Sequence, residues 1–283
     1  EAGHALPSFS PSRLPSLRHA LDSRPMPLPD NLEPAIRDPR KLRLTAWILV
    51  AIMIIGGGLI FTAYHRWSLD KASDTRPAVI HRIKQERDLR IISQDGKTHD
   101  LFELRGKVWA VHLVSTSNPQ LSQRSLAVMK RLAEKFSGQQ DFHLVTLIID
   151  PIPAEQATST LVDYANANGI QLPQWWVGTN EPKTLHRFVK SELKGSLFPH
   201  LENDRWIHDS SIVLIDRGGH LRRAVIPRKS GGTPVVLPFD FEQAASWDAK
   251  GLKSGSSRSN EEELEAVLQQ TIQTLLTETN GPS

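Results

Sequence analysis

The chain has 283 residues, which is enough for one sizeable domain with appendages. Its 34 basic and 31 acidic residues nearly balance, so the net charge of +3 does not favour a nucleic-acid-binding protein. The chain contains no cysteine, and this excludes disulfide bonds, thiolate metal ligands and thiol nucleophiles.

The N-terminal residues 1–43 are predicted to form an extended, proline-rich tail. Eight prolines fall within residues 1–40, among Ser, Arg and Leu, and no helical or alternating apolar pattern there could bury a core. Such a tail is either a solvated leader or a strap that lies along the surface of a partner. Both interpretations remain open.

The next 21 residues, 44–64, contain no charged side chain. A helix of this length rises about 1.5 Å per residue and spans roughly 30 Å, the thickness of the hydrocarbon core of a bilayer. We therefore predict a single transmembrane helix, with a buried helix of a soluble protein as the alternative. Arg37, Arg40, Lys41 and Arg43 precede the run, which predicts a cytoplasmic N-terminus and a periplasmic globular domain at the inner (cytoplasmic) membrane.

A charged segment, 65–87, is predicted to be a juxtamembrane linker, and the globular domain is predicted to occupy residues 88–280. Two short strands at 89–93 and 98–104 flank an Asp-Gly turn, which supplies the positive φ angles that a tight hairpin needs. The domain is therefore expected to begin with a β-hairpin.

Strands and helices alternate along the rest of the domain. Continuous apolar character predicts buried strands at 107–114 and 142–149. Apolar residues at helical spacing predict helices at 122–136, 155–168, 183–193 and from residue 260 onward, and a hairpin is predicted from 211–216 and 220–226. This order predicts an α/β fold with a mixed central sheet.

Five short motifs occur in an order that a known family shares. They are G106-K-V-W, S115-T-S-N-P, I149-D-P, Q174-W-W-V-G and H208-D-S-S-I-V-L-I-D-R-G-G. In this order and spacing, over residues 88–226, they resemble the SCO/SenC proteins, which are membrane-anchored factors of cytochrome oxidase assembly with a thioredoxin fold. The resemblance implies a thioredoxin-like fold for this domain.

The resemblance also implies where such proteins hold copper. In the family, two cysteines with three residues between them follow the first buried strand, and a histidine precedes a later strand. Here those positions fall on Asn118, Ser122 and His208. Copper(I) is soft and needs sulfur ligands, whereas an amide and a hydroxyl are hard, weak donors. We therefore expect no copper site, no thiol–disulfide exchange, and no other metal or cofactor.

His208 retains two interpretations. As a site residue it could titrate near neutral pH, or bind a metal with help from Asp209. As a remnant of the family's pocket it would form a hydrogen bond to Ser210 or to the turn around Asn118. Asp150 precedes a proline and is interpreted as a turn residue rather than a catalytic carboxylate. No nucleophile elbow surrounds the serines of the turn, so no catalytic residue and no enzyme are predicted.

A fold does not carry its function once its site is lost. We therefore predict a non-catalytic, membrane-anchored accessory or structural subunit that stabilises an energy-transducing membrane complex through protein–protein contacts. The alternative is an SCO-like copper-delivery or thiol-redox assembly factor with a degenerate site. The resemblance implies a respiratory heme-copper oxidase as partner, although a photosynthetic reaction-centre complex satisfies the same sequence. The other expected partner is the lipid bilayer, with no nucleic acid and no small-molecule substrate.

Overall fold

The computed structural model describes residues 38–73, 76–226, 234–252 and 257–278. The greater part of the predicted proline-rich tail, residues 1–37, lies outside the described residues. The chain divides into two units, residues 1–60 and 61–283, and each is described by itself.

The first described element is the long helix α1 (Pro39–Ser73). Its proline lies at the first helical position, where a missing N–H costs nothing, and the carboxylate of Asp38 accepts a hydrogen bond of 3.0 Å from the backbone N–H of Arg40. Residues Pro39–Arg66 are long and apolar enough to cross a membrane, and no part of their most apolar stretch is buried. The helix contains the predicted span 44–64 and extends beyond both of its ends.

A nine-stranded mixed sheet forms the centre of the globular unit, in the strand order β1-β10-β9-β4-β5-β6-β2-β3, with β11 also paired to β10. Its strands are β1 (Ala78–Arg82), β2 (Arg90–Ser93), β3 (Thr98–Asp100), β4 (Val108–Val114), β5 (Phe142–Ile148), β6 (Trp175–Thr179), β9 (Val213–Ile215), β10 (His220–Ile226) and β11 (Val235–Leu237). A separate two-stranded hairpin consists of β7 (His200–Glu202) and β8 (Arg205–Ile207).

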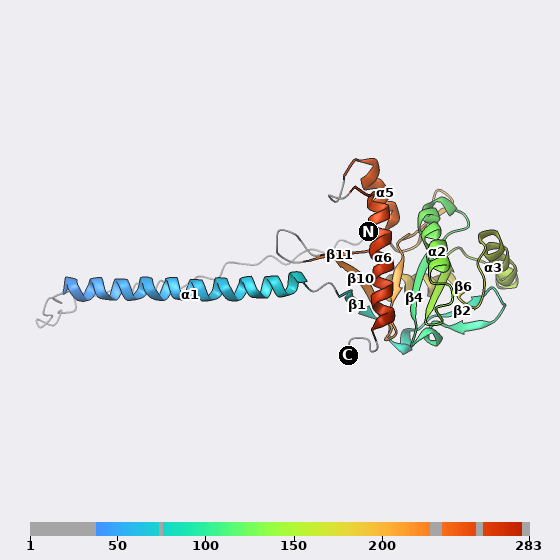
Figure 1. Ribbon diagram of the computed structural model, residues 1–283. Helices are drawn as coiled ribbons and strands as arrows, with labels where there is room; N and C mark the ends of the chain where they lie inside the picture. The colour runs from blue at the N-terminus through green and yellow to red at the C-terminus, as the bar shows by residue number, and fades with distance from the viewer. Residues whose placement is uncertain (1–37, 74–75, 227–233, 253–256, 279–283) are drawn as a thin grey trace, which may run out of the picture. The chain divides into compact units, whose positions relative to one another are not determined.

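Among its described residues the globular unit, drawn in Figure 1, has five helices beside the sheet. They are α2 (Gln123–Lys135), α3 (Ala154–Asn168), α4 (Pro182–Ser191), α5 (Phe241–Ala249) and α6 (Asn260–Thr277). Short 3-10 helices cover Gln85–Arg87, Leu101–Leu104 and Pro119–Ser122. The helix α6 begins with a capping box in which Ser259 and Glu262 bond each other's backbone N–H groups.

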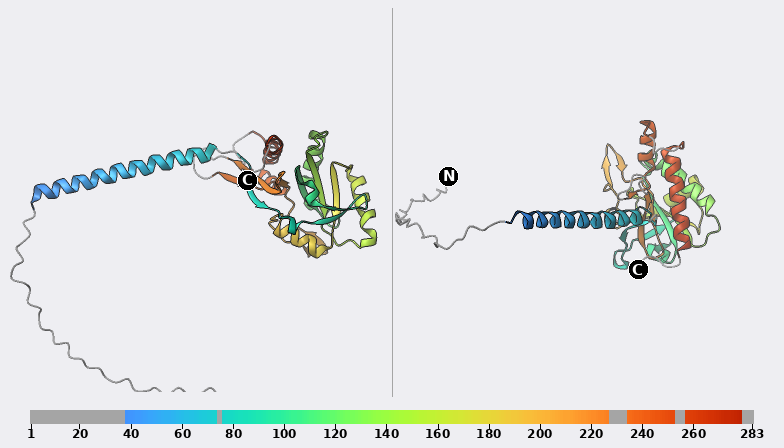
Figure 2. Two further views of the ribbon diagram at one scale, coloured as in Figure 1. Left: turned by 90° about the horizontal axis from the view of Figure 1, so that it is seen from below. Right: turned by 60° about the vertical axis from the view of Figure 1, so that its left-hand side comes forward.

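The directions of the central strands define the fold. Strands β4, β5 and β6 run parallel. On the other side of β4, strand β9 pairs antiparallel with it, and β10 pairs antiparallel with β9. The unit β4-α2-β5, the hairpin β9–β10 and the closing helix α6 form a thioredoxin-like arrangement, seen from two further sides in Figure 2. The predicted α/β class with a mixed central sheet is confirmed.

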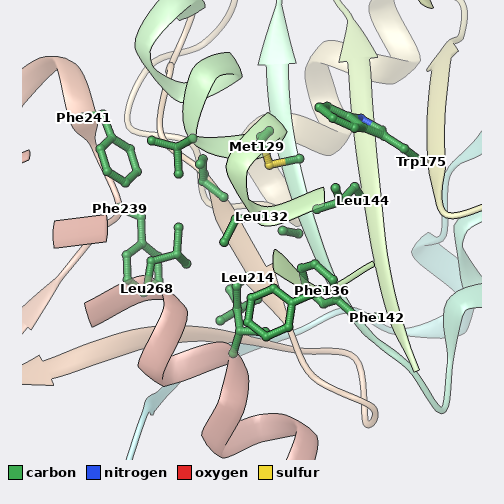
Figure 3. Close-up of a cluster of buried hydrophobic side chains, with 14 of the residues drawn as sticks. Met129, Leu132, Phe136, Phe142, Leu144, Trp175, Leu214, Phe239, Phe241 and Leu268 are labelled. Carbon is green, nitrogen blue, oxygen red and sulfur yellow. The ribbon is translucent and has the colours of Figure 1, made fainter. Parts of the chain in front are cut away.

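The sheet separates two apolar cores because successive side chains of a strand point to opposite faces. Along β4, Val108, Ala110 and Val114 belong to one core, while Trp109, Val111 and Leu113 belong to the other. The first core includes side chains of α2, α3, α5 and α6, and the second includes side chains of α4. Figure 3 shows Met129 and Leu132 of α2, and Phe136 just after its end, together with Leu268 of α6 in the first core.

The segment expected to be a linker, residues 65–87, contains regular structure. The helix α1 continues to Ser73, and β1 pairs with β10 and so belongs to the sheet. A local charge pattern does not reveal such a strand, because its pairing partner lies about 140 residues away and supplies the hydrogen bonds. Strands β6, β7, β8 and β11 and the helix α5 are also absent from the sequence prediction.

Candidate functional site

The polar turn 115–122 lies where β4 ends, at the carboxyl edge that the parallel strand β5 shares. Asp150 follows the end of β5, so the parallel pairing brings its carboxylate beside the turn. The carboxylate accepts hydrogen bonds from Ser115 Oγ at 3.0 Å, Thr116 N at 2.8 Å and Ser117 N at 3.2 Å. These residues form what we call the Asp150 network.

The centre of the network is buried, whereas Thr116 and Ser117 are exposed. Ser115 and Asp150 are both buried, and Ser115 Oγ also lies 2.9 Å from Ser117 Oγ and accepts a hydrogen bond of 3.1 Å from the backbone N–H of Asn118. A buried carboxylate is stable when it accepts several hydrogen bonds. Asp150 therefore holds the turn in place, as expected for a residue that closes a strand.

Asn118 connects the turn to the β7–β8 hairpin. Its Nδ2 donates a hydrogen bond of 3.2 Å to the carbonyl oxygen of Trp206, and the backbone N–H of Trp206 donates one of 3.2 Å to Ser117 Oγ. Trp206 also packs its ring 4.9 Å from that of His186 on α4. The amide at this position thus acts as a structural brace between the turn and the hairpin.

Ser122 is buried and immediately precedes α2. Its hydroxyl does not cap the helix, and its carbonyl oxygen accepts a hydrogen bond of 3.1 Å from Ser125 Oγ. Among the described residues, no hydrogen bond joins Ser122 to Asn118 or to His208. The structure thus brings Asn118 beside the hairpin that precedes His208, and places Ser122 at the start of the next helix.

His208 is buried, with 3% of its surface exposed, two residues after Trp206. Its Nδ1 lies 2.9 Å from the carbonyl oxygen of Asp209, and a carbonyl can only accept, so Nδ1 carries the proton. The expected hydrogen bonds to Ser210 or to the Asn118 turn are therefore replaced by one to the neighbouring backbone. The other ring nitrogen, Nε2, is buried and has no hydrogen-bond partner among the described residues.

Asp209 does not assist His208 in the way that the metal interpretation requires. Its carboxylate accepts hydrogen bonds from Ser211 N at 2.9 Å, Ser211 Oγ at 2.5 Å and Ser196 N at 2.5 Å. Burial acts to raise the pKa of Asp209, but these hydrogen bonds outweigh it and leave the pKa lowered. The carboxylate is committed to the surrounding loop.

A second buried histidine, which the sequence reasoning did not select, lies close enough to interact electrostatically with His208. His112 lies in β4 on the same face as Ala110 and Val114, fully buried, with its Nδ1 3.3 Å from Thr146 Oγ1. That hydroxyl also accepts a hydrogen bond of 2.8 Å from Trp175 Nε1. A histidine inside an otherwise apolar strand is the sequence signal that could have identified it.

The two histidines, His112 and His208, form what we call the histidine pair. Burial, followed by repulsion from His208, lowers the pKa of His112 to about 3. Burial likewise lowers the pKa of His208, against the opposing effects of Asp209 and Asp150. Both rings are therefore neutral at pH 7, and the Nε2 atom of each is buried without a partner among the described residues.

The donors at this site do not fit copper(I). Asn118 uses its amide to brace the hairpin, Ser122 offers a hydroxyl, and the chain has no sulfur ligand other than methionine. Two of the three methionines lie outside the domain, and Met129 is fully buried in the first core. No group of three or more His, Asp or Glu side chains within the described ranges could hold a metal ion.

Known proteins that are similar to this chain are found among solved structures. No family model matches the sequence, and no curated protein matches it either. Solved structures that are similar include an SCO1/SenC family lipoprotein from Bacillus anthracis, with 20% identity over 55% of this chain and 89% of that one and a TM-score of 0.40.

Two other similar structures are named as Sco proteins. ScoI of Bradyrhizobium japonicum, solved with copper bound, is 18% identical over 65% of this chain and 97% of that one, with a TM-score of 0.42. BsSco, a member of the Sco family of cytochrome c oxidase assembly proteins, is 20% identical over 62% of this chain and 97% of that one, with a TM-score of 0.42.

SCO/SenC proteins, which the sequence resembles, are thus among the similar solved structures, while the fold assignment rests on the strand order and directions of the chain itself. A helix apolar enough for a membrane anchor precedes the domain. The chain is a thioredoxin-like α/β protein that resembles the SCO/SenC proteins and contains no cysteine.

Proposed function

We propose that this chain is a non-catalytic, membrane-anchored subunit that stabilises an energy-transducing membrane complex through protein–protein contacts. One observation carries the proposal: the turn that would hold sulfur ligands is instead filled by the Asp150 network, which uses its side chains for internal hydrogen bonds. A thioredoxin-like domain without its site retains a rigid surface for binding.

The partner belongs to a respiratory complex of the heme-copper oxidase type or to a photosynthetic reaction-centre complex. The resemblance to SCO proteins supports the first, since BsSco is a member of a family of cytochrome c oxidase assembly proteins. In our proposal α1 crosses the inner membrane with its N-terminus in the cytoplasm, because basic residues crowd that flank, and the domain is periplasmic.

A second candidate is an SCO-like assembly factor that delivers copper or exchanges thiols through an altered site. The observation that favours it is the bare Nε2 of His208, a buried lone pair at the position of the family's histidine ligand. Against it stands the donor set, because one imidazole does not hold copper(I) tightly without soft partners.

Purification of the full chain from its native membrane in mild detergent tests the proposal. We expect subunits of an oxidase or a reaction centre to co-migrate with the chain at constant ratio through size-exclusion chromatography. The same purified chain should fail to compete for copper(I) with a chromogenic chelator and should fail to reduce a disulfide substrate. A chain that migrates alone and binds one copper(I) through His208 would support the second candidate instead.

The side of the membrane on which the globular domain lies is measured separately, and the cysteine-free chain is a suitable background for it. A single cysteine introduced as Glu202→Cys, on the exposed strand β7, should react with a membrane-impermeant maleimide once the outer membrane is permeabilised. Labelling only after rupture of the inner membrane would invert the topology.

A further inference from the structure

We propose that the sheet border formed by β1, β10 and β11 rests in the headgroup region of an anionic bilayer. Four apolar side chains are exposed there, and we call them the edge patch: Val79, Ile80, Ile226 and Val236. The inference rests on the membrane anchoring in the proposed function and adds to it a second, lipid-binding surface on the globular domain.

The exposed side chains of the edge patch come from three strands, because β1 and β11 both pair with β10. Strand β1 pairs with β10 over residues 220–223, and β11 pairs with β10 over residues 224–226, so the two follow each other along the same strand (Figure 1). The four side chains are between 36% and 46% exposed, although each is a large aliphatic group. Aliphatic groups that gather on one border favour an apolar or interfacial environment over water.

The charges of this border have one sign. Strands β1, β10 and β11 contain no Asp or Glu. Arg222 is buried and paired with Asp216 at 2.9 Å, whereas Arg82 and Arg223 form no salt bridge with any described residue. Uncompensated guanidinium groups beside exposed aliphatic side chains suit anionic lipid headgroups, which attract basic residues near a membrane surface.

The covalent chain keeps this border near the membrane. Val79 follows Arg66, the last residue of the candidate span, by 13 positions, so the chain between them reaches at most roughly 45 Å. A tether this short gives the border a high effective concentration at the bilayer surface. Weak contacts are therefore sufficient to hold it there.

A second copy of the chain is less well matched to this border than lipid. The register of β1 against β10 is interrupted between Val79 and His81, and such a bulge disfavours the regular addition of another strand at the edge. Two copies would also bring Arg82 and Arg223 of one border against the same unpaired arginines of the other. Like charges in contact oppose such a dimer.

The test uses the full chain with single cysteines, reconstituted in vesicles that contain headgroup-quencher lipid and either 30% or no anionic lipid. Val236→Cys reports on the edge patch, and Leu201→Cys on β7, which is 55% exposed, is the matched control. Each is labelled with a small fluorophore. We expect strong quenching at position 236 in anionic vesicles, weaker quenching in neutral vesicles, and little at position 201 in either.

A further variant, Arg82→Gln with Arg223→Gln in the Val236→Cys background, should lower the quenching in anionic vesicles toward the neutral level. Equal quenching at positions 236 and 201, with the chain floating with the vesicles, would overturn the inference and leave the anchor intact. Failure to float at all would instead remove the membrane anchor from the proposed function. Protection of position 236 only in the purified complex, and not in vesicles, would also overturn the inference, because the border would then contact a protein.

Discussion

Two polar regions lie close together in this domain, and they differ in how completely they are paired. In the Asp150 network the buried carboxylate meets three donors of the turn at 3.2 Å or less. In the histidine pair each ring forms one hydrogen bond and leaves a buried Nε2 without a described partner. The first region makes the turn rigid. The second lowers stability, because it retains two buried ring nitrogens whose hydrogen-bonding capacity is not used within the described residues.

The contrast shows how the polar groups of a thioredoxin-like scaffold can bond to one another and leave no donor set for a soft metal. Hydroxyl and amide groups at the turn satisfy one another and the hairpin, so nothing remains free to bind a soft metal. Each histidine of the pair has a partner for only one of its ring nitrogens and is held neutral by burial. The following experiments probe this difference, from the largest expected effect to the smallest.

Introduction of two cysteines into the turn should have the largest effect, which is on the affinity for copper(I). The double variant Asn118→Cys with Ser122→Cys places two thiols at the turn positions where the resemblance implies cysteines, and we expect its affinity for copper(I) to rise by orders of magnitude. The measurement is a competition titration against a copper(I) chelator with the full chain in detergent. The single variant Asn118→Cys is the control, because one thiolate does not complete the ligand set. If the double variant binds no more tightly than the wild type, more than the sulfur has been lost from the pocket.

Removal of the central carboxylate should lower stability most. The variant Asp150→Ala leaves Ser115 Oγ and two backbone N–H groups without their acceptor, and we expect a loss of about 3 kcal/mol in the free energy of unfolding. Denaturant titration followed by tryptophan fluorescence measures it. Asp163→Ala on the exposed face of α3 is the matched control and should change stability by less than about 0.5 kcal/mol. A similar loss of stability in both variants would contradict a specific stabilising role of the Asp150 network.

The histidine pair should make the protein sensitive to acid. Burial lowers the pKa of His112 to about 3, and the unfolded chain takes up a proton near pH 6.5, so only the unfolded state is protonated between these values. Stability therefore falls as the pH drops below about 6.5, and His112 contributes a loss of about 2 kcal/mol between pH 7 and pH 5. His208, whose pKa is also lowered by burial, adds a loss of the same sign.

The variant His112→Leu isolates this contribution. Its unfolding free energy should change less between pH 7 and pH 5 than that of the wild type, by about 2 kcal/mol. His200→Gln, at an exposed position on β7, is the control and should keep the slope of the wild type. Identical slopes in the wild type and in His112→Leu would contradict the burial of a neutral imidazole at this position.

Removal of the hydrogen bond between the turn and the hairpin should have the smallest effect on stability. The variant Asn118→Ala removes the hydrogen bond to the carbonyl oxygen of Trp206, at an expected cost of about 1 kcal/mol. Hydrogen exchange should become faster in β7 and β8 and stay unchanged in β5. Gln120→Ala, in the exposed part of the same turn, serves as the control. Unchanged exchange in the hairpin of Asn118→Ala would show that the Ser117 hydrogen bond and the ring of Trp206 hold the hairpin without the amide.

Local patterns predicted much of the fold. The uncharged run lies within α1, and the apolar runs form β4 and β5. The stripe with Leu264 and Leu268 lies on α6, which packs into the first core. These elements are long and strongly patterned, and their own residues determine them. Strand β1 did not emerge in this way, because its charged, half-exposed sequence becomes a strand only through pairing with β10.

The sequence predicted which chemical groups the site contains, but not how they are arranged. The amino-acid sequence by itself determined that the chain contains no thiol, that Asn118 and Ser122 occupy the turn, and that a membrane-length helix precedes the domain, since these facts depend on composition and local pattern. Only the tertiary structure decided that Asp150 closes the turn, that Asn118 braces Trp206, and that His112 lies near His208. Each of these contacts joins residues more than 30 positions apart, and their proximity follows from the parallel β4–β5 pairing and from the packing of the hairpin.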